Sequence, residues 1–391
     1  MNILFIHQNF PGQFKHLAPA LAAETGNRVV ALTLRDDLPR EWQGVSIRPY
    51  QVKRSTCSEM HPWLQDMETK IIRAEACFHA ALALAKDGFT PDVIIAHPGW
   101  GESLFIKEVW PNARLGIYCE FYYNTTGATV GFDPEFPDTD PGTPCRLRLK
   151  NANTILHFDL ADAAIAPTPW QASTFPQPFR EKISVIHDGI DTRHLIPADD
   201  VWLKVGKSLK LTRDDEVITF VNRNLEPIRG YHIFMRALPE LLVRRPNARV
   251  FIVGGDEVSY GAPNPDGKSW RQKYLEEVRD QIPKNDLARV HFVGKLPYAD
   301  FVRLLQLSTV HVYLTYPFVL SWSLLEAMSI GCAIVASNTR PLHEVISHDE
   351  TGRLVDFFDG KGLVEQVISL LDNPGERARL GRNARKFAVE H

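Results

Sequence analysis

Short runs of hydrophobic residues alternate along this chain with longer stretches in which apolar side chains recur every three or four positions. Apolar runs of about 4–8 residues predict buried strands, and the helical spacing predicts helices with one buried face. In the first half, strands are expected at 3–6, 29–34, 93–96, 115–119, 163–166 and 183–186, and helices at 15–24 and 79–86. In the second half, strands are expected at 216–222, 248–254, 290–293, 310–313 and 333–336, and helices at 232–245, 270–282, 298–306, 324–330, 363–371 and 374–390. This alternation is typical of right-handed βαβ units that build parallel sheets.

The chain of 391 residues is long enough for two domains of similar size, because single hydrophobic cores stop growing at about 250–300 residues. A polar stretch at 192–215 separates the two series of strands and helices and is the expected linker. We therefore expect an α/β protein in which residues 1–195 and 196–391 form two Rossmann-like lobes. Their parallel sheets would face each other across a cleft, with ligands at the carboxyl ends of the strands.

Charge and composition exclude several classes of protein. Lys and Arg number 44 against 47 Asp and Glu, which gives a net charge of −3, so nucleic acid is not an expected partner. No apolar run is long enough to span a membrane, and the first residues, MNILFIHQNF, lack the basic start of a signal peptide. The five cysteines are widely spaced and include no CxxC pair, as in proteins with reduced thiols. We expect a cytoplasmic protein without a transmembrane segment, which leaves peripheral contact with a membrane open.

Two arginines flank the turn after the first strand of the second half. Arg223 follows the strand predicted at 216–222, and Arg229 precedes Gly230 at the start of the next helix. Guanidinium groups offer forked donors that suit phosphate oxygens, and the N-terminus of a helix adds backbone N–H groups. The pair therefore predicts a phosphate-binding site. The alternative is that both arginines are solvated surface residues.

A second candidate site lies where a strand leads into the helix predicted at 324–330. The N–H groups of a helix that starts near Ser321 to Ser323 could bind a diphosphate. Glu326 lies in the first turns of this helix, and a carboxylate there can bind both hydroxyls of a ribose. The alternative is that Glu326 complements the positive end of the helix dipole.

Together these residues resemble the family 4 retaining glycosyltransferases, whose GT-B fold has two facing Rossmann-like lobes. The segment with Arg223 and Arg229 resembles the family's pyrophosphate clamp, with Arg229 in place of a lysine. Further resemblance lies in IHDGID at 186–191, HFVGKL at 291–296, LEAM at 325–328, AIVAS at 333–337, HEVI at 343–346 and TG at 351–352. The resemblance implies that the nucleotide sugar is bound by Gly254, Lys295, Leu296, Ser323, Leu324, Leu325 and Glu326.

Three further positions depart from the family pattern. Eight residues before Glu326 the family usually has a glutamate that contacts the sugar, and this chain has Phe318. Ser321 replaces a glycine, and Asp188 replaces an asparagine. These departures concern recognition of the sugar more than recognition of the nucleotide.

The first half is expected to bind the acceptor. His97 follows the strand predicted at 93–96 and begins a tight loop in which Trp100 would offer an exposed ring to a sugar. Glu120 follows the strand predicted at 115–119, where relatives often place His or Asp. A packed histidine and a charged strand end are the structural alternatives. The loop at 7–12 resembles the family's N-terminal loop, in which Gly12 would let the backbone approach the donor phosphates.

The resemblance implies transfer of a sugar from a nucleotide-diphosphate sugar to a saccharide or other hydroxyl acceptor, with retained anomeric configuration. The catalytic residues would be Arg223, Arg229, Glu120 and His97. Because two arginines can stabilise a leaving diphosphate, we expect neither a metal nor a resident cofactor. A nucleotide-sugar 2-epimerase and a non-catalytic sugar-nucleotide binding protein remain alternatives. An NAD oxidoreductase is disfavoured, since neither half has GxGxxG after its first or second strand.

Overall fold

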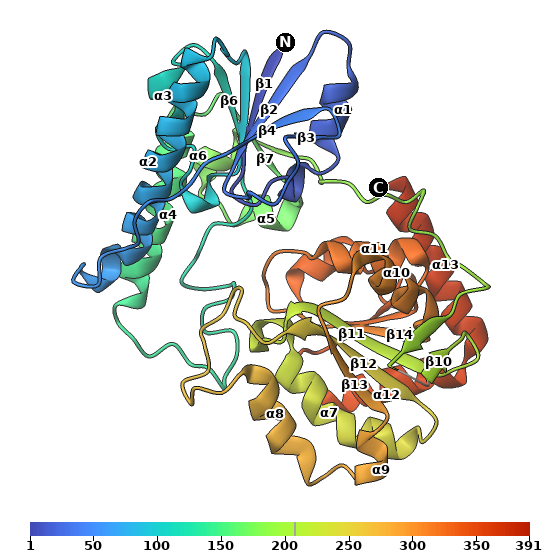
Figure 1. The fold of residues 1–391 in the computed structure, drawn as a ribbon. Coiled ribbons are helices and arrows are strands. Elements are labelled where there is room, and N and C mark those ends of the chain that lie inside the picture. Colours follow the sequence, from blue (N-terminus) through green and yellow to red (C-terminus); the bar gives the residue numbers. More distant parts are fainter. Residues whose placement is uncertain (207–208) are drawn as a thin grey trace. The chain divides into compact units, whose positions relative to one another are not determined.

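The computed structural model describes residues 1–206 and 209–391, which form two compact units (Figure 1). Unit 1 is Met1–Gly189, coloured from blue to green, and unit 2 is Ile190–His391, coloured from green to red. The boundary between 189 and 190 lies a few residues before the one expected between 195 and 196. No helix in the described ranges combines the length and hydrophobicity that crossing a membrane requires.

Unit 1 is built on an eight-stranded sheet in the order β3-β4-β2-β1-β5-β6-β7-β8, parallel throughout except for the pair β3–β4. Strand β1 lies between β2 and β5, so the strand order reverses there. In open α/β sheets, ligands bind beside such a reversal at the carboxyl ends of the strands. The strands are β1 (Asn2–Ile6), β2 (Arg28–Thr33), β3 (Glu41–Trp42), β4 (Val45–Pro49), β5 (Val93–Ala96), β6 (Arg114–Tyr118), β7 (Ala163–Ala166) and β8 (Ile183–Val185).

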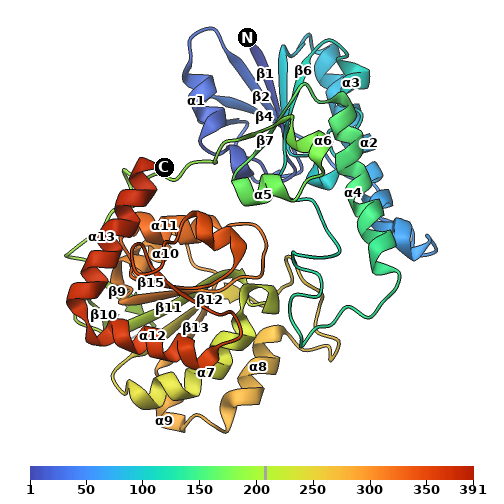
Figure 2. The same cartoon turned by 180° about the vertical axis from the view of Figure 1, so that it is seen from behind.

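Helices cover both faces of this sheet, with α1 on one side and α2, α3 and α4 on the other (Figures 1 and 2). Ile3 and Phe5 belong to the core under α1, whereas Leu4 and Ile6 belong to the core under α2 and α3. Successive strand residues point to opposite faces, so an unbroken apolar run fills both cores. The helices are α1 (Leu17–Ala23), α2 (Gln65–Lys86), α3 (Ile106–Val109), α4 (Thr143–Leu160), α5 (Pro169–Ser173) and α6 (Gln177–Arg180), with short 3-10 helices η1 (Gly12–Phe14), η2 (Pro62–Leu64) and η3 (Pro98–Trp100).

Unit 2 is built on a six-stranded parallel sheet in the order β13-β12-β11-β14-β15-β16. Here β11 lies between β12 and β14, so the order reverses at β11 as it does at β1 in unit 1. Two further strands, β9 and β10, form an antiparallel hairpin. The strands are β9 (Leu203–Val205), β10 (Leu209–Leu211), β11 (Val217–Asn224), β12 (Arg249–Gly255), β13 (Val290–Gly294), β14 (Val310–Tyr313), β15 (Ile334–Ser337) and β16 (Arg353–Val355).

The sheet of unit 2 also lies between two helical layers, with α10 and α11 on one face and α7, α8 and α12 on the other (Figures 1 and 2). Helix α13 packs so closely on the end of α11 that a side chain at Gly381 would collide with the carbonyl oxygen of Gly331. The helices are α7 (Tyr231–Arg244), α8 (Trp270–Arg279), α9 (Lys284–Leu287), α10 (Tyr298–Leu307), α11 (Trp322–Ile330), α12 (Gly360–Asp372) and α13 (Pro374–Glu390), with 3-10 helices η4 (Pro227–Arg229) and η5 (Arg340–Glu344).

The predicted strands and helices are present, with ends that move by a few residues, but three expectations were wrong. Helix α2 begins at Gln65 rather than at 79, and α4 was not predicted at all. The expected linker at 192–215 belongs to unit 2 and contains the β9–β10 hairpin; residues 207 and 208 of that stretch lie outside the described part. Asn373 stands at the start of α13, and its side chain donates to the carbonyl of Ser369.

Candidate functional site

Both units carry their predicted residues at the carboxyl ends of parallel strands, as expected for open α/β sheets. In unit 1, Gly12, His97 and Glu120 lie on the loops after β1, β5 and β6. In unit 2, the ends of β11 to β14 and the loops that follow them carry the predicted set Arg223, Arg229, Gly254, Lys295, Leu296, Ser323, Leu324, Leu325 and Glu326. The sequence therefore placed each candidate at the right edge of its sheet.

Arg229 is a buried arginine, with 5% of its surface exposed. Its Nη1 donates to the Thr315 hydroxyl at 2.9 Å, to the carbonyl of Val319 at 3.1 Å and to the Tyr313 hydroxyl at 3.3 Å. Its Nε and Nη2 have no acceptor among the described residues, and both keep some contact with solvent. No carboxylate pairs with this buried charge in the described chain, and a buried charge without a counter-ion is the environment that an anionic ligand would complete.

Two aromatic rings cover the guanidinium of Arg229. Its Cζ lies 5.2 Å from the ring centre of Tyr260 and 5.4 Å from that of Phe318, and the two rings meet edge to face at 5.1 Å. Phe318 is buried, whereas Tyr260 is 41% exposed. The phenyl ring that replaces the family's glutamate therefore packs on the arginine, where cation–π attraction stabilises the guanidinium.

The loop that carries Tyr260 is held by a buried carboxylate that sequence reasoning missed. Glu226 is fully buried and accepts the backbone N–H groups of Ser259, Tyr260 and Gly261 at 3.0, 3.1 and 2.8 Å. The amide of Asn224 also donates to the Ser259 hydroxyl at 2.6 Å. Hydrogen bonds to a carboxylate are stronger than neutral ones, so Glu226 fixes the loop that places Tyr260 over Arg229. In the sequence, Glu226 is a charged residue between a strand and Pro227, and nothing in that pattern predicts a buried carboxylate that binds another loop.

Arg223 and Lys295 are exposed cations at the same edge of the sheet. Lys295 Nζ lies 2.5 Å from Glu257 Oε2, and this hydrogen bond, helped by the charge of Arg223, lowers the pKa of Glu257 below its usual value. Arg223 falls within β11, at a register shift between Val221 and Asn224, rather than after the strand as predicted. The exposed pair adds two cations to the edge of the sheet that also carries Arg229.

The N-terminus of α11 is less open than predicted. The hydroxyl of Ser321 accepts the N–H of Ser323 at 3.3 Å, and the carbonyl of Ser321 accepts the N–H of Leu324 at 3.2 Å. The side chains of Leu324 and Leu325 belong to the core of unit 2. A diphosphate would therefore have to compete with a serine cap, and the two leucines contribute backbone rather than side-chain atoms.

Glu326 is 5% exposed, and its Oε1 accepts the hydroxyl of Tyr298 at 2.8 Å. The glutamate therefore has a defined partner on α10 and does more than face the helix dipole. Leu296 packs against the core, and Gly254 fits closely against Leu225, because a Cβ at that position would lie 2.8 Å from its Cδ2.

A chain of hydrogen bonds links the loops of unit 1. The Nδ1 of His7 accepts the N–H of Asn9 at 3.0 Å, so the ring proton is on Nε2 and is donated to Gln13 Oε1 at 2.7 Å. Gln13 Nε2 in turn donates to Glu120 Oε1 at 3.1 Å. Burial lowers the pKa of His7 to about 4, so this histidine is neutral at pH 7. Sequence reasoning identified neither His7 nor Gln13, which orient the Glu120 carboxylate.

His97 lies against the same carboxylate. It is 2% exposed, its Nδ1 accepts the N–H of Gly99 at 3.2 Å, and its Nε2 stands 3.7 Å from Glu120 Oε2 without a hydrogen-bond partner. Burial lowers the pKa of His97 well below its usual value. Its ring stacks on Trp100 at 4.4 Å and Tyr118 at 5.3 Å. His97 and Glu120 thus form one polar site, and Glu120, which is 35% exposed, is its accessible member.

One expectation for this half was wrong. Trp100 is half-buried against His97 rather than an exposed platform. Gly12 has a φ of 46°, and a side chain there would collide with the imidazole of His7, so packing requires glycine at this position. The expected approach of this backbone to donor phosphates stays a prediction. Asp188 accepts the hydroxyl of Tyr118 at 3.0 Å, which gives this departure from the family pattern a partner.

Glu102, in the loop after β5, makes the stability of unit 1 depend on pH. Burial raises its pKa to about 7 from a usual 4.5, although Arg73 acts in the opposite direction. The folded state holds this proton more tightly than the unfolded state, so the free energy of unfolding falls as pH rises from about 4.5 to 7. We expect the wild type to lose about 2–3 kcal/mol more than Glu102→Gln between pH 5 and pH 8 in urea unfolding. Parallel pH dependences in the two proteins would contradict this.

Among residues 1–206 and 209–391, no group of three or more His, Cys, Asp or Glu side chains is arranged to hold a metal ion.

Two family models match consecutive parts of the chain. The glycosyl transferase family 4 group matches residues 25–195, and glycosyl transferases group 1 matches residues 205–387. The two matches together cover most of both units.

Named relatives match over part of the sequence. D-inositol 3-phosphate glycosyltransferase of Corynebacterium efficiens is 28% identical over 214 residues, which cover 54% of this chain and 47% of that protein. Phosphatidyl-myo-inositol mannosyltransferase of Mycolicibacterium smegmatis is 30% identical over 172 residues, covering 42% of this chain and 39% of that protein. The matched region is thus about half, or less, of each relative's length.

Solved structures match over the whole chain. Sucrose-phosphate synthase of Thermosynechococcus elongatus is similar with a TM-score of 0.71 at 18% identity, covering 100% of this chain and 94% of that one. HepE of Anabaena, solved in complex with UDP-glucose, is similar with a TM-score of 0.67 at 17% identity, covering 100% and 95%. These likenesses confirm the predicted α/β fold of the GT-B type. With both family models matched in order along the sequence, the chain belongs to the family 4, group 1 glycosyltransferases.

Proposed function

We propose that this protein transfers a sugar from a nucleotide-diphosphate sugar to a hydroxyl-bearing acceptor, with retained anomeric configuration and without a metal. The observation that carries the proposal is Arg229, a buried cation without a carboxylate partner in the described chain, whose Nε and Nη2 remain available. Arg223 and Lys295 add exposed positive charge at the same edge of the sheet. Three cations at one edge of the sheet suit the charge of a diphosphate.

In the proposed reaction, the bond between the sugar and the diphosphate breaks and negative charge grows on the departing diphosphate. Arg229 and Arg223 stabilise that charge, and the fixed donors of Arg229 need no reorganisation as it develops. The acceptor hydroxyl attacks from the leaving-group side and gives its proton to a diphosphate oxygen, which retains the anomeric configuration. HepE was solved with UDP and with UDP-glucose, which makes UDP-glucose the first donor to test.

Unit 1 is proposed to bind the acceptor at Glu120 and His97. The hydrogen bonds from His7 through Gln13 hold one oxygen of Glu120, which leaves the other near His97 and partly exposed. A carboxylate in this setting can accept a hydrogen bond from an acceptor hydroxyl and orient it. The names of two relatives refer to inositol compounds, so ring polyols are a reasonable class of acceptor to test.

The proposal is tested with a panel of UDP-, GDP- and ADP-sugars. A donor present at about 100 times its Kd should raise the free energy of unfolding by about 2.7 kcal/mol. Incubation of that donor with ring polyols, followed by mass spectrometry and NMR of the anomeric proton, should show a product of retained configuration that forms equally in EDTA. Isomerisation of the sugar nucleotide without an acceptor would instead indicate an epimerase. Binding without any turnover would indicate a non-catalytic binding protein.

Glu326 gives a further prediction about the nucleoside. If its carboxylate binds the ribose hydroxyls, Glu326→Gln should weaken UDP binding about tenfold, since hydrogen bonds to charged groups contribute about 1.5–3 kcal/mol. Calorimetry should show that the wild type binds a 2′,3′-dideoxy nucleotide more weakly than UDP. Glu326→Gln should bind the two nucleotides with equal affinity. Tyr298→Phe is the matched control, because it removes the partner of Glu326 Oε1 and keeps the carboxylate. An equal dideoxy penalty in both proteins would show that Glu326 contacts something else.

A further inference from the structure

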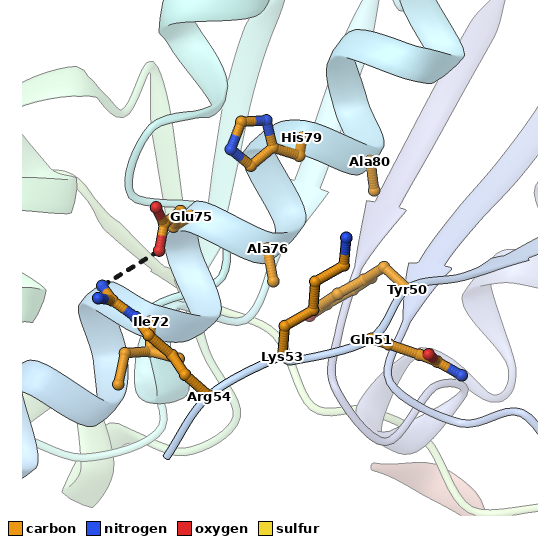
Figure 3. A pocket seen from close by; sticks show the side chains of 9 residues that line it. All are labelled: Tyr50, Gln51, Lys53, Arg54, Ile72, Glu75, Ala76, His79 and Ala80. Atoms are coloured by element: carbon orange, nitrogen blue, oxygen red, sulfur yellow. Dashed lines mark ion pairs between the residues drawn. The ribbon is translucent and has the colours of Figure 1, made fainter. Parts of the chain in front are cut away.

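Unit 1 has a pocket of about 540 Å³ that lies beside the end of β4 and the middle of α2 (Figure 3). One wall is the chain that leaves β4, with Tyr50, Gln51, Lys53 and Arg54. The other wall is one face of α2, where residues recur at helical spacing: Ile72, Glu75, Ala76, His79 and Ala80. The hollow exists because Ala76 and Ala80 have small side chains; larger side chains at these positions would fill it. A volume of this size is typical of sites for small molecules.

The rim of this pocket is cationic. Lys53 makes no ion pair or hydrogen bond with any residue in the described ranges, and Figure 3 shows its ammonium group pointing into the space between α2 and the chain that leaves β4. Arg54 pairs with Glu75 at 3.2 Å, but both side chains are more than half exposed, at 61% and 51%. Exposed ion pairs of this kind are weak and open readily to a better anion. An anion that enters the pocket therefore finds one unpaired ammonium group and one guanidinium that can turn toward it.

The inner wall is the ring of Tyr50, which Figure 3 shows behind the aliphatic stem of Lys53. Tyr50 is 6% exposed, and its hydroxyl is sealed from solvent near Cys77, Glu102 and Arg73, none of which lines the pocket. The pocket therefore meets the ring of Tyr50 rather than its hydroxyl.

We propose that this pocket binds a small organic phosphate. Its hydrocarbon part lies on Ala76 and Ala80, and its phosphate group is bound by Lys53. A phosphate dianion has enough charge and enough acceptors to hold Lys53 and to draw Arg54 away from Glu75. The site is separate from the residues assigned to transfer, so the proposal does not depend on the transferase function.

The test is calorimetric titration of the full chain with hexyl phosphate. We expect saturable binding of hexyl phosphate, with no comparable binding of 1-hexanol or inorganic phosphate. Lys53→Gln should raise the Kd about tenfold, the effect of losing one charged hydrogen bond. Lys86→Gln is the matched control, since Lys86 is an exposed lysine at the end of α2, outside the pocket. Ala80→Leu should abolish binding by filling the hollow, with thermal unfolding used to verify that each variant is folded.

Several results would overturn the proposal. Absence of saturable hexyl phosphate binding would do so, as would equal affinity for 1-hexanol, or equal losses in Lys53→Gln and Lys86→Gln. Binding to vesicles of phosphatidic acid without binding to hexyl phosphate would identify a lipid surface instead of a free organic phosphate. Binding of UDP-sugars should be the same in Lys53→Gln as in the wild type, which keeps this result distinct from a failure of the transferase proposal.

Discussion

Arg223→Ala should lower kcat/KM for sugar transfer by about a hundredfold or more and leave the fold intact. Arg223 is an exposed side chain at the end of β11, so its removal opens no cavity. The loss of one charged donor at a site of developing negative charge raises the barrier by about 2.7–4 kcal/mol. The free energy of unfolding should change by less than about 0.5 kcal/mol, as for most surface substitutions. Steady-state kinetics with the best donor of the panel, together with urea unfolding, measures both effects.

A second arginine provides the control for this experiment. Arg279 is an exposed arginine near the end of α8, in the same unit, and its side chain has no hydrogen-bond or ion-pair partner among the described residues. Arg279→Ala removes the same charge from the protein without touching the candidate site. If nucleotide binding and kcat/KM change as little in Arg223→Ala as in Arg279→Ala, Arg223 does not bind the diphosphate.

Arg229→Ala should behave differently, because it removes stability and activity together. The substitution leaves the carbonyl of Val319 and the hydroxyl of Thr315 without their donor, whereas the Tyr313 hydroxyl still accepts the N–H of Ser321; it also opens space between the rings of Tyr260 and Phe318. A buried acceptor that loses its donor costs about 1–3 kcal/mol, and the cavity adds to this. We expect the free energy of unfolding to fall by about 3 kcal/mol and donor binding to disappear. Urea unfolding and calorimetry with the same donor are the measurements.

Two variants separate these effects. Arg229→Lys should keep most of the stability and part of the activity, since an ammonium group can still donate to Thr315 and Val319. Arg236→Ala removes an arginine of α7 that pairs with Glu277 at the surface, and it should cost less than about 1 kcal/mol. An Arg229→Ala protein as stable as Arg236→Ala would show that the buried hydrogen bonds contribute little.

The apolar pattern predicted the sheets well because parallel strands are buried on both faces. Leu4 and Ile6 face one core and Ile3 and Phe5 the other, so four apolar residues in a row identify the strand. Helix α4 escaped prediction for the opposite reason. Its buried face includes Asn151, Asn153 and His157, which hydrogen-bond to Tyr123, Pro98 and Ser103. A helix that buries polar side chains has little hydrophobic periodicity to detect.

The candidate site was predictable in position but not in detail. Strand ends located Arg223, Arg229, His97 and Glu120, yet the sequence treats the two arginines alike. The structure separates them, with Arg229 buried between aromatic rings and Arg223 exposed. The link from Gln13 to Glu120 joins loops more than a hundred residues apart, and such a contact depends on the strand order, which the sequence did not supply. The predicted facing of the two sheets stays a prediction.

The attachment of the Tyr260 loop to Glu226 has a consequence for how this protein can be altered. Glu226 binds the N–H groups of residues 259–261, and every residue except proline supplies the same N–H. These three hydrogen bonds to Glu226 therefore do not depend on the side chains of the loop residues. A library randomised at Tyr260 alone, which keeps the hydrogen bond from Asn224 to the Ser259 hydroxyl, should yield mostly folded proteins that differ in the surface over Arg229. Under the proposed function, the choice of donor can then change at this loop by single substitutions while the scaffold beneath it stays unchanged.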